Sequence, residues 1–183
     1  MSLRFGTDGV RGVANRELTP ELVTALGRAA ARVLGTDQPY VIGRDTRRSG
    51  PMLEAALVAG LCAEGADVLL AGVLPTPAVA TIAQRRGGPA AMITASHNPF
   101  PDNGVKLFAA GGRKLTDAVE QAIERELHEL ATAARVGPDG RGVGVASELR
   151  DALDVYVAHV TSVLDGRRLD GLRVVIDCGH GAA

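Results

Sequence analysis

Short apolar runs alternate with amphipathic segments over most of this chain. The runs are rich in Val, Ile, Leu and Ala and have the length of buried strands, whereas the intervening segments repeat apolar residues at the spacing of one helix face. This pattern predicts strands at 40–43, 68–71, 90–94 and 105–108 and helices at 20–34, 49–65, 75–83 and 116–130.

Polar and glycine residues mark where these helices begin and end. Thr19 precedes Pro20, an arrangement typical of an N-cap followed by proline at the first helical position. Gly35 is expected to end that helix. Ser49 and Thr116 are expected to cap two of the helices that follow.

The alternation of strand and helix predicts an α/β fold. We expect a three-layer αβα domain with a mixed, mostly parallel sheet that helices cover on both faces. Ligands of such sheets usually bind at the carboxyl ends of the strands. Ser96 follows one predicted strand and Arg44-Asp45 follows another, so both are candidates for a site.

A glycine-rich break in composition at 136–144 divides the chain. A helix at 149–164 and a strand at 172–177 are predicted after it, so we expect residues 1–147 to form one domain and residues 148–183 to form a linker helix and the incomplete beginning of a second α/β domain. A lone strand is half of a βαβ unit, which indicates the front of a longer protein. Its exposed edges could pair with a second copy in a homodimer.

The composition supports a packed core and argues against several classes of protein. Of 183 residues, 46% are hydrophobic but only 3% are aromatic, so the core must be built from Ala, Val, Leu and Ile. A formal charge of −1 does not suit a nucleic-acid binder. With no apolar run of membrane length and no signal-peptide pattern, a cytoplasmic protein without a membrane partner is expected. Cys62 and Cys178 lack the spacing of a zinc or disulfide motif.

The segment 94–108 carries the most informative chemistry. Ser96 and His97 follow a predicted strand, and turn residues at 102–104 precede the next strand. If the two strands pair, Lys106 returns close to Ser96, which would bring a hydroxyl nucleophile, an imidazole and an ammonium group into one site of the kind that phosphoryl transfer requires. Ordinary turn chemistry is the alternative interpretation.

Two other segments have features of phosphate sites. The segment 5–12 places Arg11 among glycines that let backbone approach a ligand, although an N-terminal segment held by an Asp–Arg pair would look the same. The segment 43–50 lies between a strand and a helix, where an anion could bind or where loop charges and a helix cap could simply face solvent.

Together these segments resemble the α-D-phosphohexomutase family, and within it the bacterial phosphoglucosamine mutases. The resemblance is collinear over nearly the whole chain. It rests on Phe5–Gly12, Gly43–Gly50, Leu74–Pro77, Thr94–Phe108 and Val174–Gly181. Thr-Ala-Ser-His-Asn-Pro at 94–99, continued by Asn-Gly-Val-Lys at 103–106, is its most specific part.

The resemblance implies that the chain belongs to an intramolecular phosphotransferase, an isomerase. In that family a phosphoserine on Mg²⁺ donates its phosphoryl group to a hexose monophosphate and recovers one from the resulting bisphosphate. Carried onto this sequence, Ser96 is the phosphocarrier and a metal ligand, while Lys106 and Arg11 transfer protons or stabilise charge and His97 supports them. The expected substrate- and phosphate-binding residues are Thr7, Asp8, Gly9, Arg44, Asp45 and Asn98.

The expected reaction interconverts glucosamine 6-phosphate and glucosamine 1-phosphate for cell-wall precursor synthesis, with hexosamine 1,6-bisphosphate as intermediate and activator. The family's aspartate-rich metal loop and its sugar- and phosphate-binding loops lie beyond residue 183, so the chain alone is expected to be inactive. Phosphomannomutase or phosphoglucomutase activity is an alternative. A non-catalytic sugar-phosphate-binding module is another, and a nucleotide-binding dehydrogenase is the weakest because no glycine fingerprint is present.

Overall fold

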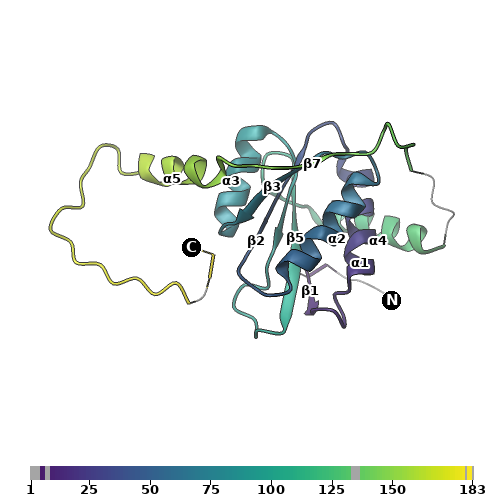
Figure 1. Cartoon of the computed structure of the whole chain (residues 1–183), viewed down its shortest axis with the longest axis horizontal. Coiled ribbons are helices and arrows are strands. Elements are labelled where there is room, and N and C mark those ends of the chain that lie inside the picture. Colours follow the sequence, from purple (N-terminus) through teal and green to yellow (C-terminus); the bar gives the residue numbers. More distant parts are fainter. Residues whose placement is uncertain (1–4, 7–8, 133–136, 180, 183) are drawn as a thin grey trace.

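A computed structural model describes residues 5–6, 9–132, 137–179 and 181–182. In this part of the chain, a mixed seven-stranded sheet lies between two layers of helices (Figure 1). The strands are β1 (Val10–Val13), β2 (Tyr40–Arg44), β3 (Val68–Val73), β4 (Ala90–Ile93), β5 (Asp102–Ala109), β6 (Arg113–Lys114) and β7 (Ala146–Glu148). The helices are α1 (Pro20–Leu34), α2 (Gly50–Cys62), α3 (Thr76–Arg86), α4 (Asp117–Thr132) and α5 (Ala152–Ser162).

The sheet has the order β1-β5-β4-β2-β3-β7, with β6 paired to β5. The pairs β2–β3, β2–β4 and β3–β7 are parallel, whereas β5 runs antiparallel to both β4 and β1. The predicted three-layer α/β fold with a mostly parallel mixed sheet is therefore confirmed.

Successive side chains of the buried strands enter two different cores. Ile42 belongs to the apolar cluster that α1, α2 and α4 cover, whereas its neighbour Val41 belongs to the cluster that α3 and α5 cover. This division follows from the two-residue period of a strand. Strands that are apolar on both faces are the reason why the chain reads as continuous apolar runs.

Small residues let α1 and α2 approach closely. At Gly60, a Cβ would collide with the carbonyl oxygen of Thr24 and would lie 3.0 Å from the backbone nitrogen of Arg28. The contact is reinforced by the largely buried Glu64 carboxylate, which accepts from Arg28 Nε at 2.5 Å and from Arg32 Nε at 2.8 Å. The two helix backbones thus pack closely against each other, in a chain with few large aromatic side chains to fill the space between helices.

The predicted helix caps are correct in part. Thr19 accepts a 3.3 Å hydrogen bond from the N–H of Leu22, and Gly35 ends α1 with a positive φ of 89°. Ser49 precedes α2 as expected, but its hydroxyl makes no cap bond and accepts a hydrogen bond from the Asn103 side chain instead.

The turn predicted at 102–104 is wrong, because these residues begin β5 and pair with β1, a strand that the pattern did not predict. Gly104 serves close packing: a Cβ there would lie 2.6 Å from the carbonyl oxygen of Thr94. The chain turns earlier, where Asn98 N–H donates to Ala95 O and Asp102 N–H donates to Pro99 O, both at 3.0 Å.

Beyond the glycine-rich segment the chain returns to the sheet. β7 adds to the edge at β3. α5 lies within the predicted helix and packs next to α3, with its first residue, Ala152, in the core, and Leu149, which precedes α5, is in the same core. The strand predicted at 172–177 is wrong: the segment is not paired with any described strand, and Val175 is 98% exposed. An extended segment becomes a strand only when a neighbour supplies hydrogen bonds. The domain boundary after residue 147 remains a prediction.

Candidate functional site

Two neighbouring parallel strands end side by side and bring the predicted site residues together. β2 ends at Arg44 and β4 ends at Ile93, and the two strands are in register at these residues. The N–H of Asp45 donates a 3.0 Å hydrogen bond to the carbonyl of Ile93, which extends the pairing past the strand ends. Residues 94–101, which we call the serine loop, therefore leave the sheet directly beside residues 45–49.

Ser96 lies exposed on this loop in a left-handed backbone conformation, with φ of 55°. Such a conformation costs about 1–3 kcal/mol for a non-glycine residue and persists only where neighbouring contacts fix it. One of these contacts is a 2.9 Å hydrogen bond from the Ser96 N–H to Thr94 Oγ1. Ser96 Oγ lies 3.4 Å from His97 Nδ1, so an imidazole nitrogen is near the hydroxyl.

Asp45 stands beneath the loop as a buried carboxylate. Its Oδ2 accepts hydrogen bonds from Thr94 Oγ1 at 2.7 Å and from Arg47 Nε at 3.1 Å, and its Oδ1 accepts one from the Arg47 N–H at 3.0 Å. Because these donors occupy both oxygens, Asp45 in this structure supports the loop and does not face a ligand.

Arg47 was not among the predicted site residues, yet it is bonded to the serine loop at several points. Its terminal nitrogens donate to the backbone carbonyls of Ser96, Asn98, Pro99 and Asp102 at 2.8–2.9 Å. Charge-assisted hydrogen bonds of this kind are stronger than neutral ones. The sequence shows several arginines at 44–48, and only the tertiary contacts distinguish the one that holds the loop.

The N-terminal segment joins the site through β1. Arg11 NH1 donates to Asn98 Oδ1 at 3.3 Å, and Asn98 Nδ2 donates to Asp102 Oδ2 at 3.0 Å. Gly9, with φ of 89°, packs so closely on β5 that a Cβ would collide with Val105 O and lie 2.9 Å from Lys106 Cα. Thr7 and Asp8, the other predicted residues of this segment, lie outside the described residues.

Lys106 and Arg44 lie on strands next to the serine loop, but their side chains contact other residues. β4 and β5 do pair as predicted, but the register sets Lys106 opposite Met92, and its Nζ lies 5.8 Å from the centre of the Phe108 ring. Arg44 Nε donates to Glu54 Oε2 at 3.1 Å. Among the described residues, no hydrogen bond joins either of these side chains to Ser96.

A sequence model of the phosphoglucomutase/phosphomannomutase family, for its alpha/beta/alpha domain I, matches residues 2–134. The chain belongs to this family.

Individual members of the phosphoglucomutase/phosphomannomutase family match over the whole chain. The chain is 53% identical to the phosphoglucosamine mutase of Salinispora arenicola and 54% identical to that of Rhodococcus opacus, and it covers 42% of each of these proteins. An X-ray structure of a family member from Burkholderia thailandensis matches with a TM-score of 0.71 at 28% identity over 86% of this chain and 35% of that one. The chain thus spans less than half the length of these relatives.

A complete magnesium site is not formed by the described residues of this family member. No group of three or more His, Cys, Asp or Glu side chains gathers among them, whereas Mg²⁺ prefers six oxygen ligands. Asp45 is already occupied by Thr94 and Arg47. Near the loop, the described chain offers the exposed hydroxyl of Ser96, and a complete set of ligands would need groups from elsewhere.

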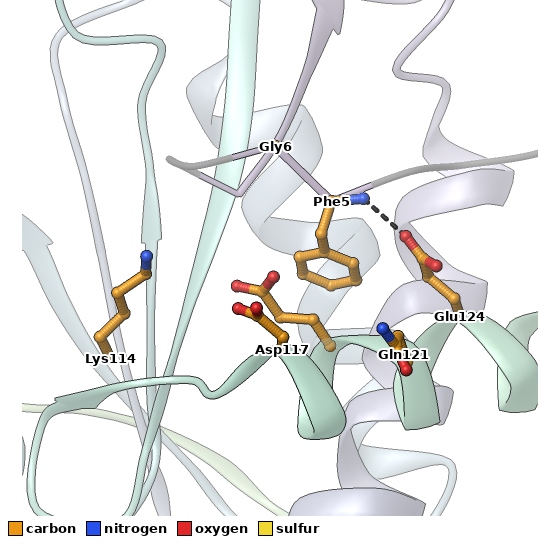
Figure 2. A pocket seen from close by; sticks show the side chains of 7 residues that line it. Phe5, Gly6, Lys114, Asp117, Gln121 and Glu124 are labelled. Carbon is orange, nitrogen blue, oxygen red and sulfur yellow. Dashed lines mark hydrogen bonds between the residues drawn. The ribbon is translucent and has the colours of Figure 1, made fainter.

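A hollow of about 360 Å³ lies apart from the serine loop, between the N-terminal segment and α4 (Figure 2). Phe5 and Gly6 line it on one side, and Phe5 N–H donates to Glu124 Oε1 at 2.7 Å. The other lining residues are Lys114, Asp117, Glu120 and Gln121. None of the described residues predicted for phosphoryl chemistry lines it.

Across the described part of the chain, no helix has both the length and the apolar character to cross a membrane.

Proposed function

We propose that this chain is the phosphoserine domain of a phosphoglucosamine mutase, with Ser96 as the residue that carries the phosphoryl group. The observation that carries the proposal is Ser96 itself, an exposed hydroxyl in a left-handed conformation at the end of a parallel strand. Identity of 53% and 54% with two phosphoglucosamine mutases supports the choice of an amino-sugar phosphate as substrate.

In the proposed reaction, the bond between Ser96 Oγ and phosphorus breaks as a hydroxyl oxygen of the hexosamine phosphate bonds to phosphorus. The proton of that hydroxyl ends on Ser96 Oγ, and the sugar becomes a hexosamine 1,6-bisphosphate. When the other phosphoryl group returns to the enzyme, Ser96 Oγ attacks phosphorus and must lose its proton. His97 Nδ1, at 3.4 Å, is within reach to take it. Arg11, on β1, donates to Asn98 of the serine loop and adds positive charge where phosphate oxygens would gather.

Mg²⁺ belongs to the proposal as an ion held in part by the oxygen of Ser96 or of its phosphoryl group, where it would neutralise phosphate charge. Its remaining ligands would come from outside this chain. A cytoplasmic location is also proposed, since Cys62 and Cys178 are both free thiols, as is usual in a reducing compartment.

A chimeric enzyme tests the function, because the relatives are longer than this chain. Residues 1–183 would replace the matching N-terminal part of the Salinispora arenicola enzyme, and conversion of glucosamine 6-phosphate to glucosamine 1-phosphate would be measured with hexosamine 1,6-bisphosphate present. We expect turnover within about tenfold of the parent enzyme, and a gain of one phosphate on the peptide that contains Ser96.

The control is Ser96→Ala in the same chimera, which should lose turnover and the phosphate label together. Thermal unfolding of both proteins checks that they are folded. A folded chimera without turnover, or turnover that survives Ser96→Ala, would overturn the proposal.

A further inference from the structure

We infer that Arg47 is a positioning residue for the phosphoryl group. By holding the Ser96 carbonyl, its guanidinium aims the next backbone N–H, that of His97, away from itself and toward solvent, where the N–H can donate to a phosphoryl oxygen on Ser96. The inference rests on the proposed function, because it concerns the group that Ser96 is proposed to carry.

The first step of the argument is the geometry of one peptide unit. Arg47 NH2 donates to Ser96 O at 2.8 Å. The described residues contain no cis peptide bond, and in a planar trans peptide the C=O and the following N–H point in opposite directions. Fixing the Ser96 carbonyl on the guanidinium therefore fixes the direction of the His97 N–H.

The second step is that this N–H is available. The neighbouring amides are occupied, since Ser96 N–H donates to Thr94 Oγ1 and Asn98 N–H donates to Ala95 O. Among the described residues, none accepts from the His97 N–H, and His97 lies exposed at the surface. A phosphoryl oxygen is a strong acceptor for such a donor.

The third step is that the arrangement depends on a guanidinium. Arg47 holds three serine-loop carbonyls and that of Asp102 at once, and is itself held by Asp45. A lysine keeps the charge but lacks the planar fork that can span several acceptors. Ser96 keeps its left-handed φ because both sides of its loop are tied to this one group.

Nuclear magnetic resonance of the 183-residue chain tests the inference without any need for turnover. Phosphoserine would be introduced at position 96 during synthesis, and the His97 amide proton would be followed with and without the phosphate. We expect a downfield shift on phosphorylation, and a titration that follows the second ionisation of the phosphate near pH 6. Arg47→Ala should abolish both effects, and Arg47→Lys should reduce them.

Arg48→Ala is the matched control, since Arg48 is the adjacent arginine and is exposed. It should leave the His97 response unchanged. Amide shifts of β2 and β4 report whether each variant is folded, and if Arg47→Ala unfolds the chain, the Arg47→Lys variant decides. A His97 amide that does not respond in the wild-type chain, or that responds equally in a folded Arg47 variant, would overturn the inference.

The chimera separates this result from the proposed function. Arg47→Ala there should lower kcat on the order of 100-fold with little change in KM, as when one donor to a developing charge is lost. An inactive parent chimera would count against the proposed function alone, because the phosphoserine in the magnetic resonance experiment is installed by synthesis.

Discussion

Asn103 Nδ2 donates a 2.9 Å hydrogen bond to Ser49 Oγ, across 54 residues of sequence. The bond joins the beginning of β5 to the residue before α2, and Asn103 Oδ1 also accepts the N–H of Gly104 at 2.8 Å. Because Asn103 is completely buried, its amide has no water to replace these partners. The two segments that flank the candidate site are thus tied together below it.

Replacing this amide should therefore destabilise the domain. We expect Asn103→Ala to lower the free energy of unfolding in urea by about 1–3 kcal/mol, since it leaves buried groups without partners. Ser49→Ala removes the same hydrogen bond, but Ser49 is only half-buried, so this change should lower the free energy of unfolding by less. If the double variant costs no less than the sum of the single ones, the two side chains are not coupled as the structure indicates.

The close contact between α1 and α2 predicts a strong effect at Gly60. A Cβ at this position would collide with Thr24 O, so Gly60→Ala must push the helices apart and should cost about 1–3 kcal/mol of unfolding free energy. Gly140→Ala is the matched control, because nothing lies within 4 Å of a Cβ there. Equal melting temperatures for the two variants would contradict the packing described for these helices.

The Glu64 carboxylate makes part of the stability depend on pH. Burial raises its pKa, but the hydrogen bonds from Arg32 and Arg28 outweigh burial, and the pKa lies below the ordinary 4.5. A lowered carboxyl pKa contributes stability above the ordinary value, and that contribution is lost as the pH falls through the lowered one.

Unfolding free energies from pH 7 down to pH 3 would show this for the wild type and for Glu64→Gln. We expect the wild type to be more stable at pH 7 and the difference to shrink below pH 4.5. Glu129→Gln, at an exposed position of α4, should show no such trend. A constant difference between wild type and Glu64→Gln at all pH values would contradict the ion pairing.

The two free cysteines should differ in reactivity. Burial raises the pKa of the Cys62 thiol and the nearby charge of Asp67 raises it further, whereas Cys178 is exposed. Alkylation with iodoacetamide at pH 8, followed by peptide mass mapping, should modify Cys178 first because the thiolate is the reactive form. In denaturant the two rates should become similar. Faster labelling of Cys62 in the folded chain would contradict its partly buried position at the end of α2.

The buried strands and the helices of the first half of the domain were predictable from local pattern. Apolar runs such as residues 40–43 can be satisfied only between two layers of helices, and Thr19-Pro20 marks a helix start by local chemistry alone. β1 was not predictable in the same way. Val10 and Val13 are separated by Arg11 and Gly12, so the segment has no apolar run, and it forms a strand because β5 lies beside it.

For the candidate site, the sequence indicated the positions at the strand ends but not the contacts there. Arg47 donates to Ser96, Asn98 and Asp45, so these residues lie around one side chain where the parallel strands end. That Arg47, and not Arg44, holds the serine loop depends on side-chain directions at two adjacent strand ends, which a linear pattern does not encode.

The pairing of β1 with β5 also has a consequence for the order of folding. Val10 lies opposite Val105, so the strand that carries Arg11 is made first during synthesis but has no partner until more than half of the chain has followed. Contacts so distant in sequence form slowly, because closing the long loop costs entropy before any pairing compensates for it. The parallel strands and their helices can assemble without β1. Arrival of Arg11 beside Asn98 would then be among the last folding events, and the site would mature after the domain that supports it.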